Sequence, residues 1–376
     1  MRILVINGGS SSFKCRLDEL PEGPLPIAPP KPVWEKRLDW DQGSSVPAVL
    51  EPVLRSVPGP VDVVGHRIVH GGPVYRQTAA LTTEVRAAIA KEIEFAPAHN
   101  RFELEAVQAV DQFLGPGVLQ IAVFDTGFHS TLTPDAYVYP GPYEWLDQGI
   151  RRYGFHGINH QYASRRAAEL LGADPASPRL IICHLGNGAS LAAVRGGKSV
   201  DTTMGFTPLE GLMMGTRCGS IDPGILLYLI RHRGSTAEQL DEILNRKSGL
   251  LGVSGISGDM REIESAMDAG KERAQLAFDV YVHRLTREIG AMLAVLGGVD
   301  AIVFTGGVGE NSVRLRERVC GNLGFLSLKL DAAKNAQPSG DEDIATADSQ
   351  VRVLVIRAQE EWEIARECHL LMHAAQ

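Results

Sequence analysis

The sequence predicts an α/β protein of two domains, and three observations support this class. The chain has 376 residues, whereas roughly 150 residues is a usual domain size. Short apolar runs typical of buried strands recur in both halves, and stretches with helical spacing separate them. A strand followed by a glycine-rich turn occurs after Ile6 and again after Cys183. This echo indicates a duplicated unit.

The expected strands are short apolar runs. They cover Ile3–Ile6, Val61–Val64, Ile121–Phe124, Leu180–Cys183, Ala301–Phe304 and Val351–Ile356. Apolar spacing of three and four predicts helices over 85–93, 104–114 and 276–297. Such alternation is typical of α/β layers, so mostly parallel pairing is expected. Residues 21–32 contain six prolines and are expected to form an extended surface segment.

Composition narrows the function classes. An apolar fraction of 44% and a charged fraction of 22% are those of a globular protein, which excludes a disordered chain, a collagen or a coiled coil. The formal net charge of −8 argues against a nucleic-acid partner. The N-terminal apolar run stops at Asn7, too short for a signal peptide, and no run approaches the roughly 18 residues of a membrane span. We therefore expect neither a nucleic-acid nor a membrane partner.

The cysteines point to a reducing compartment. They are five in number and widely scattered: Cys15, Cys183, Cys218, Cys320 and Cys368. None stands at the C-x-x-C spacing of a zinc site, and an odd number does not form a disulfide framework. Reduced, mostly buried thiols in a cytoplasmic protein are expected.

Three glycine-rich segments follow predicted strands. Gly8–Phe13 and Gly186–Leu191 are either ordinary hairpins or hairpins whose backbone N–H groups cradle phosphate across a cleft. The third segment, Thr305–Asn311, is expected to be a glycine turn at the carboxyl end of a strand. Ligands of α/β sheets bind there, and this position favours a nucleotide's adenosine.

Arginine stands beside glycine in Gly65–Gly72, Arg151–Gly157 and Met214–Gly219. Its fork of donors matches a phosphate or a carboxylate, although a surface salt bridge is the commoner role of arginine. Three such segments in an acidic chain favour an anionic substrate. Asp125 follows a predicted strand, where it is either a catalytic or metal-directed carboxylate or a turn or helix-capping residue.

Together these segments closely resemble the acetate kinase family over nearly the whole chain. Eight ordered motifs carry the resemblance: Asn7–Lys14, Gly65–Gly72, Phe124–Thr126, Arg151–Gly157, His184–Gly188, Met214–Gly219, Ser257–Arg261 and Gly306–Asn311. The resemblance implies two duplicated actin-like (ribonuclease H-like) α/β domains with a nucleotide cleft between them. The N-terminal domain would comprise residues 1–148, completed by 360–376, and the C-terminal nucleotide-binding domain residues 149–359.

The activity that the resemblance implies is reversible phosphoryl transfer between ATP and acetate, giving ADP and acetyl phosphate. Mg²⁺ is the implied cofactor, for which Mn²⁺ can substitute, and a homodimer is the implied assembly. The Mg²⁺-associated residues match Asn7 and Glu360, with Glu361 as an alternative because Gln359 stands where the family usually has asparagine.

The other site residues are carried over in the same way. The catalytic residues match Arg67, Asp125, His156 and Arg217, of which the two arginines hold acetate and the phosphoryl group and His156 acts at the transition state. The acyl pocket matches Val69, Ala98, Phe155 and Pro208. The nucleotide-binding residues match Lys14, His184, Leu185, Gly186, Asn187, Gly188, Asp259, Met260, Arg261, Gly306, Gly307, Val308, Gly309 and Glu310.

Two chemical expectations refine this assignment. Acetate, with a pKa of roughly 4, is ionised at neutral pH and needs no general base, so Asp125 is expected to orient Mg²⁺, Arg217 or the nucleophile. Ala98 replaces the family's usual leucine. Because one methylene in an apolar pocket is worth about 1–3 kcal/mol, this change could admit propionate.

Three rival functions remain beside acetate kinase. A propionate kinase of the same fold is the nearest. A nucleotide-driven binding protein would not need the arginine pair, and a sugar kinase would not have the apolar set at Val69, Phe155 and Pro208.

Overall fold

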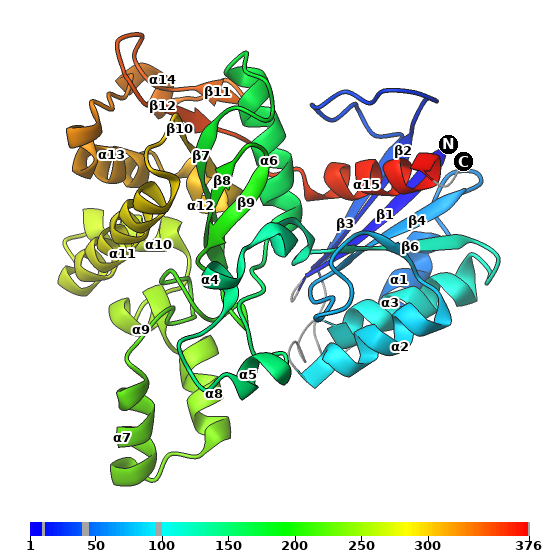
Figure 1. Cartoon of the computed structure of the whole chain (residues 1–376), viewed down its shortest axis with the longest axis horizontal. Helices are drawn as coiled ribbons and strands as arrows, with labels where there is room; N and C mark the ends of the chain where they lie inside the picture. The colour runs from blue at the N-terminus through cyan, green and yellow to red at the C-terminus, as the bar shows by residue number, and fades with distance from the viewer. Residues whose placement is uncertain (10–11, 40–44, 95–99, 375–376) are drawn as a thin grey trace.

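The computed structural model describes residues 1–9, 12–39, 45–94 and 100–374. These residues form two six-stranded sheets (Figure 1). The strands of the first sheet are β1 (Arg2–Gly8), β2 (Ser12–Glu19), β3 (Trp34–Asp39), β4 (Val63–Ile68), β5 (Ala79–Ala80) and β6 (Leu119–Phe124). Those of the second are β7 (Arg179–Leu185), β8 (Ala189–Arg195), β9 (Lys198–Thr202), β10 (Ala301–Thr305), β11 (Glu342–Asp343) and β12 (Arg352–Val355).

The two sheets have the same topology. Their strand orders are β3-β2-β1-β4-β6-β5 and, read from the other end, β9-β8-β7-β10-β12-β11. In the first, β1–β4 and β4–β6 are parallel, and β1–β2, β2–β3 and β5–β6 are antiparallel. The second sheet repeats this pattern pair by pair. The expected duplicated α/β class is therefore confirmed.

The expectation of mostly parallel pairing was wrong, because three of the five pairings in each sheet are antiparallel. The glycine-rich segments after β1 and β7 account for one antiparallel pairing in each sheet. Each closes a hairpin, and a hairpin makes its two strands antiparallel. Gly8 pairs with Phe13 across the first hairpin, and Leu185 pairs with Ala189 across the second.

Most element predictions hold to within a few residues. The expected helices appear as α2 (Thr83–Lys91), α3 (Asn100–Phe113) and α11 (Glu272–Leu296). Two predictions need correction. Strand β4 starts later than expected and continues to Ile68, so Arg67 lies on this strand. The segment expected as a turn at 306–311 is helix α12 (Gly306–Asn311), because Gly306, with φ +79°, makes the whole bend.

Helices cover both faces of each sheet (Figure 1). Helices α1 (Val46–Leu54) and α3 pack on one face of the first sheet, and α15 (Glu360–Ala374) packs on the other. Helix α11 covers one face of the second sheet and α6 (Gly157–Leu170) the other. Because α6 and α15 contact each other, one apolar cluster continues from the first sheet into the second. The C-terminal helix thus lies on the N-terminal sheet, and residues 1–148 with 360–376 remain our expected N-terminal domain.

The other helices lie mostly in the second half. They are α4 (Pro134–Tyr137), α5 (Glu144–Asp147), α7 (Pro223–Arg233), α8 (Ala237–Arg246), α9 (Gly249–Ser254), α10 (Met260–Asp268), α13 (Val313–Asn322) and α14 (Ala332–Ala336). Short 3-10 turns cover Glu92–Glu94, Gly127–Thr131 and Gly324–Leu326. In the part of the chain that is described, no helix is long and apolar enough to traverse a bilayer. All five cysteines are unpaired, as expected.

Candidate active site

The candidate active site forms where strands of both sheets end. Asn7 lies near the end of β1, Arg67 on β4, and Asp125 directly after β6. His184 lies near the end of β7, and Glu360 opens α15. Asn7 bonds to Glu360 although 353 residues separate them. The fold therefore gathers at one place the residues that the sequence analysis assigned to catalysis and to Mg²⁺.

An ion pair between Arg67 and Asp125 lies in the first half of the site. The Arg67 guanidinium donates from Nη2 to Asp125 Oδ2 at 2.7 Å and from Nη1 to the Gly8 carbonyl at 3.0 Å. Burial opposes the charge of Arg67, but the nearby carboxylates, Asp125 first and then Glu360, more than offset it and raise the pKa of Arg67. Burial also raises the pKa of Asp125, against the lowering effect of Arg67. The second oxygen of Asp125, Oδ1, is buried without a hydrogen-bond partner.

Two glutamates at the start of α15 face Asn7. The Asn7 amide donates to Glu360 Oε2 at 3.0 Å and to Glu361 Oε1 at 2.8 Å. Lys14 Nζ lies 3.3 Å from the same oxygen of Glu361. Burial disfavours ionisation of Glu360, but Arg67 and neighbouring groups lower its pKa below the usual value. Glu360 therefore carries a negative charge, while Lys14 neutralises Glu361.

Arg217 brings a second cation from the other half of the chain. Its Nη1 donates to the Pro208 carbonyl at 3.1 Å, and no Asp or Glu among the described residues forms an ion pair with it. Burial, and then the proximity of Arg67, lower its pKa. A Cβ atom at Gly188 would lie 3.5 Å from this Nη1 and 3.4 Å from His156 Nε2, so glycine keeps the space beside both groups open. Two arginines and one hydrogen-bonding ring make this an anion site.

His156 is held in an unusual backbone conformation at the start of α6. Its φ of +57° lies in the left-handed region, which a non-glycine residue occupies only at a cost in free energy. The next residue compensates, because the Gly157 N–H donates to the Asp125 carbonyl at 2.8 Å. The His156 ring stacks on His184 with centroids 4.2 Å apart. Burial lowers the pKa of both rings, so both are neutral near pH 7.

The predicted nucleotide segments lie on the second half of the chain, except for Lys14, which lies on β2 of the first sheet. Asp259 caps helix α10, where its carboxylate accepts from the Arg261 N–H at 2.9 Å and pairs with the Arg261 side chain. The loop before it is close to the hairpin at Asn187, because a Cβ at Gly258 would meet the Gly215 carbonyl and the Gly215 N–H donates to the Asn187 carbonyl.

Some of the residues predicted to bind the nucleotide have side chains that are engaged in the protein's own structure. Glu310 Oε1 accepts from the Gly306 and Ala358 N–H groups at 2.9 Å each, so it holds the β10–α12 bend. The Leu185 and Met260 side chains belong to the buried core. At these two positions only the backbone is available to a ligand.

The acyl-pocket residues fall into two groups. Val69 and Phe155 are buried in one apolar cluster, and Pro208 is held against Arg217 through its carbonyl. Ala98 lies outside the described residues. Beneath the pocket, Glu103 Oε2 accepts from the Val69 N–H at 2.9 Å. Burial raises the pKa of Glu103 to about 8.

Sequence reasoning missed several buried polar residues that organise the site. They are Asn100, Glu103, Asn159, His160 and Ser190. Only Glu103 carried a signal, as a charged residue three and four positions before Ala106 and Val107 on the apolar stripe of helix α3. The paired arginines at 151–152 are structural. Arg151 lies over the Tyr137 ring, and Arg152 forms an ion pair with Glu210 at 2.8 Å.

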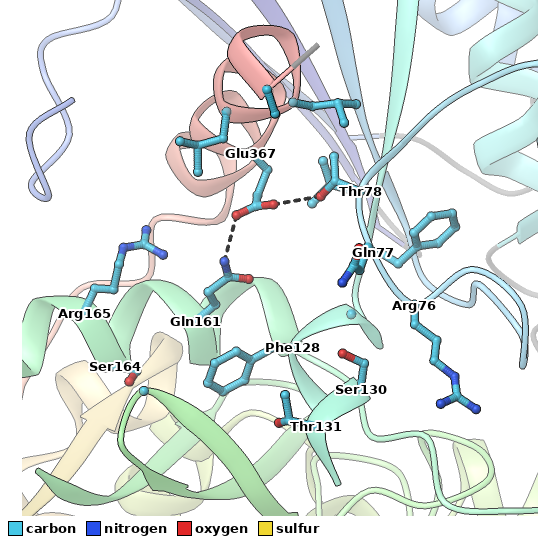
Figure 2. Close-up of a pocket in the computed structure, with 17 residues that line it drawn as sticks. Arg76, Gln77, Thr78, Phe128, Ser130, Thr131, Gln161, Ser164, Arg165 and Glu367 are labelled. Atoms are coloured by element: carbon cyan, nitrogen blue, oxygen red, sulfur yellow. Dashed lines mark hydrogen bonds between the residues drawn. The ribbon is translucent and has the colours of Figure 1, made fainter. Parts of the chain in front are cut away.

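A separate pocket lies between α6, α15 and residues 76–78 (Figure 2). It contains none of the predicted site residues. Figure 2 shows Glu367 reaching both halves of the chain: it accepts from Thr78 Oγ1 at 2.8 Å and from Gln161 Nε2 at 2.7 Å. Beside it, Arg165 of α6 pairs with Glu363 of α15. This pocket marks where the two halves are joined.

Whether this site can bind Mg²⁺ depends on the oxygen ligands that its residues offer. Among the described residues, no group of three or more His, Cys, Asp or Glu side chains is arranged to hold a metal ion. Mg²⁺ does not need one, because it usually binds one or two carboxylates together with substrate phosphates and water. The unpartnered Asp125 Oδ1 and the ionised Glu360 are oxygen donors of this kind. The residues present therefore fit Mg²⁺.

The duplicated topology and the anion site shared between its halves define a phosphotransferase-like protein of the actin-like α/β class. A putative N-acetylmannosamine kinase from Listeria monocytogenes has the same fold, with a TM-score of 0.51 at 13% identity, and the match covers 100% of each chain. The chain belongs to the acetokinase family, whose model matches residues 50–366.

Similar proteins agree with this membership over almost the full length. An acetate kinase of Gloeobacter violaceus is 54% identical, with 98% of each chain covered. The crystal structure of Porphyromonas gingivalis acetate kinase has a TM-score of 0.88 at 39% identity and covers 99% of both chains. A propionate kinase from Francisella tularensis has a TM-score of 0.87 at 33% identity, over 97% of this chain and 98% of that one.

Proposed function

We propose that this enzyme transfers the γ-phosphoryl group of ATP directly and reversibly to acetate, giving acetyl phosphate and ADP. The observation that carries the proposal is the meeting of Arg67 and Arg217 beside a neutral His156, with Arg217 lacking an acidic partner in the described chain. A small carboxylate and a phosphoryl group are anions that such a site would hold. Relatives named acetate kinase, at more than half identity, support the same substrate.

In this proposal the chemistry is mainly alignment and charge neutralisation. Arg67 and Arg217 bind the acetate carboxylate and the equatorial phosphoryl oxygens. His156 donates a hydrogen bond to the group in transfer. Asp125 orients Arg67 and does not remove a proton, because acetate is already ionised. Arg217 was one of the groups that Asp125 was expected, from the sequence, to orient. The arginine with which Asp125 forms an ion pair is Arg67.

We assign ATP and ADP mainly to the second half, with Lys14 of β2 contributed by the first. Lys14, the hairpin at His184–Gly188, the loop at Asp259–Arg261 and the bend at Gly306–Glu310 would bind them. Asn7, Asp125 and Glu360 would hold Mg²⁺, directly or through water. The ion would neutralise phosphate charge, and Mn²⁺ would substitute for it.

The acyl pocket supports a small acid. Val69 and Phe155 are buried apolar side chains, which suit a short acyl group better than a polar one. Propionate is the second candidate substrate, because Ala98 is smaller than leucine and a solved relative is a propionate kinase.

One experiment tests these alternatives together. Purified enzyme with ATP and Mg²⁺ is given acetate, propionate or butyrate, and acyl phosphate is trapped as hydroxamate. We expect acetate to lead. A lead for propionate that Ala98→Leu reverses would make the enzyme a propionate kinase. ATP hydrolysis without acyl phosphate from any acid would indicate a nucleotide-driven binding protein and contradict the proposal.

We also infer a cytoplasmic homodimer. Five unpaired cysteines suit a reducing compartment. Helix α7 has no buried residue and projects from the second half (Figure 1). It exposes four large apolar side chains, Ile225, Leu227, Tyr228 and Ile230. A second copy of the chain is the partner that would cover them.

A further inference from the structure

Ser190 connects two histidines behind the candidate active site. It lies on β8 and is fully buried. Its Oγ is 2.9 Å from His156 Nδ1 and 2.8 Å from His160 Nε2, one turn further along α6. No third partner of this hydroxyl is found within the described chain. The three side chains therefore form a linear arrangement of hydrogen bonds.

The number of protons limits how this arrangement can be made. A hydroxyl has one hydrogen to donate, and a neutral imidazole has one N–H and one bare nitrogen. If Ser190 donates to His156 Nδ1, then His160 Nε2 must donate to Ser190, and the proton of His156 stands on Nε2. In the reverse order, His156 donates from Nδ1, and the proton of His160 stands on its own Nδ1.

Burial decides between the two orders. His160 Nδ1 is buried without a hydrogen-bond partner. The reverse order would place an unpaired N–H there, and orphaned buried N–H groups are rare because they cost free energy. The first order leaves only a bare nitrogen at that position. It also places the other proton on His156 Nε2, which lies on the open side of a half-buried ring, facing Gly188 and Arg217.

The neighbouring ring, that of His184, also uses its Nδ1 as a hydrogen-bond acceptor. The Asn159 amide nitrogen lies 2.8 Å from His184 Nδ1 and 3.2 Å from Thr305 Oγ1. A donated amide proton makes His184 Nδ1 an acceptor, so the proton of this ring also stands on Nε2. With these hydrogen bonds, the two stacked rings would carry their protons on the same ring position.

We propose that Ser190 and His160 are positioning residues that hold the proton of His156 on Nε2, so that a neutral N–H donor points at the group being transferred. The catalytic consequence rests on the proposed function, whereas the tautomer can be measured without any turnover. A donor fixed in place before the reaction needs no reorientation in the transition state. With the proton on Nδ1, the same ring would present a lone pair to an anion.

The direct test is a nitrogen NMR spectrum of the enzyme with ¹⁵N-labelled histidine near pH 7.5. Protonated and bare ring nitrogens resonate far apart, and the His156→Gln variant identifies the His156 signals among those of 11 histidines. We expect the Nε2–H form in the unmodified enzyme. An Nδ1–H form would overturn the proposal, whether or not the enzyme makes acyl phosphate.

Three variants then test the roles of Ser190 and His160. In Ser190→Ala the tautomer should become mixed, and kcat should fall about ten- to a hundredfold with KM values nearly unchanged. Ser190→Thr keeps the hydroxyl and should restore both. His160→Phe should weaken the preference in the same direction.

A matched control comes from Ser199. Its hydroxyl lies 2.8 Å from His129 Nδ1, so Ser199→Ala also removes a serine–histidine bond, but one made by neither His156 nor Ser190; the His129 ring keeps its second contact, from Nε2 to the Phe155 carbonyl at 3.0 Å. It should leave the His156 tautomer and kcat as they are. An unchanged kcat in Ser190→Ala, or an equal loss in Ser199→Ala, would overturn the positioning role.

Discussion

Arg67 and Asp125 form a buried 2.7 Å ion pair that leaves one carboxylate oxygen of Asp125 without a partner. The pair comes from the ends of neighbouring parallel strands, β4 and β6. Arg67 Nη1 also reaches the Gly8 carbonyl at the end of β1. The carboxylate therefore fixes the arginine on one side and keeps a free oxygen for a ligand on the other.

The first prediction concerns this pair. Asp125→Asn keeps an oxygen for Arg67 but removes the negative charge, and we expect kcat to fall by about 10²–10³ through loss of alignment. The acidic limb of the pH–rate profile should remain, because Asp125 abstracts no proton. Disappearance of that limb in step with the loss of rate would contradict a purely orienting role.

The second prediction concerns Glu103, whose pKa is raised to about 8 by burial. A carboxyl group with a raised folded-state pKa must stay protonated, so its contribution to stability declines as pH rises from about 4.5 to 8. Glu103→Gln should therefore gain stability relative to the unmodified protein as pH rises through this window. Glu103→Ala leaves the buried Val69 N–H unpaired and should lose about 1–3 kcal/mol.

Urea unfolding at pH 5, 6.5 and 8 measures both Glu103 variants. A free-energy difference between Glu103→Gln and the unmodified protein that does not change with pH would show that Glu103 is ionised in the folded state.

The third prediction concerns acid stability. Burial lowers the pKa of His66, His70 and His129 to about 4. Each ring binds a proton on unfolding below about pH 6.5, so the stability present above that pH is lost as pH falls toward 4. One such proton changes the unfolding free energy by about 1.4 kcal/mol per pH unit.

His66→Gln removes one of these rings. The unfolding free energy, measured by urea unfolding between pH 7.5 and 5, should therefore depend less steeply on pH, by the contribution of at most one proton. The exposed His283 on α11 provides the matched control, and His283→Gln should keep the original slope. Equal slopes in the two variants would contradict the assignment.

The fourth prediction concerns the link between the two halves. Glu367 accepts from Thr78 and from Gln161, two hydrogen bonds of about 1 kcal/mol each. Glu367→Ala should therefore speed amide hydrogen exchange at the start of α6 and around residue 78 by roughly tenfold. Glu272→Ala, an exposed change on α11, is the control. Unchanged exchange at both places would show that other contacts hold the halves together.

The fifth prediction concerns assembly. Leu227→Glu combined with Ile230→Glu places charge on the exposed apolar side chains of α7. Light scattering should give a dimeric mass for the unmodified protein and a monomeric mass for this variant. Phe325→Glu, which changes an equally apolar exposed side chain elsewhere, should remain dimeric. A monomer in the unmodified protein would refute the inferred homodimer.

Local patterns predicted much of this molecule. Apolar runs located six of the twelve strands in the described chain to within a few residues, because a buried strand has few polar positions; the other six strands were not predicted. The glycine segments after Ile6 and Cys183 indicated the duplication that the two sheets confirm. Strand direction was mispredicted, because alternation of elements does not reveal which turns close hairpins.

The candidate site also has residues that the sequence predicted and residues that only the structure revealed. Arg67, Asp125, His156 and Arg217 stand in recognisable motifs, and they were identified before any fold was known. Their partners were not. Ser190 and Glu103 are ordinary residues in sequence, and only burial beside a histidine or a backbone N–H gives them a task.

By itself, the sequence determined the class, the duplicated plan, the family and the residue types that meet an anionic substrate. These properties depend on short-range patterns that each segment carries with it. Only the tertiary structure decided that Asn7 meets Glu360, that Asp125 holds Arg67, and that Glu361 is neutralised by Lys14. Such pairings join residues between 58 and 353 positions apart in the sequence. The charge, proton and conformation of each group follow from burial, which exists only once the chain has packed.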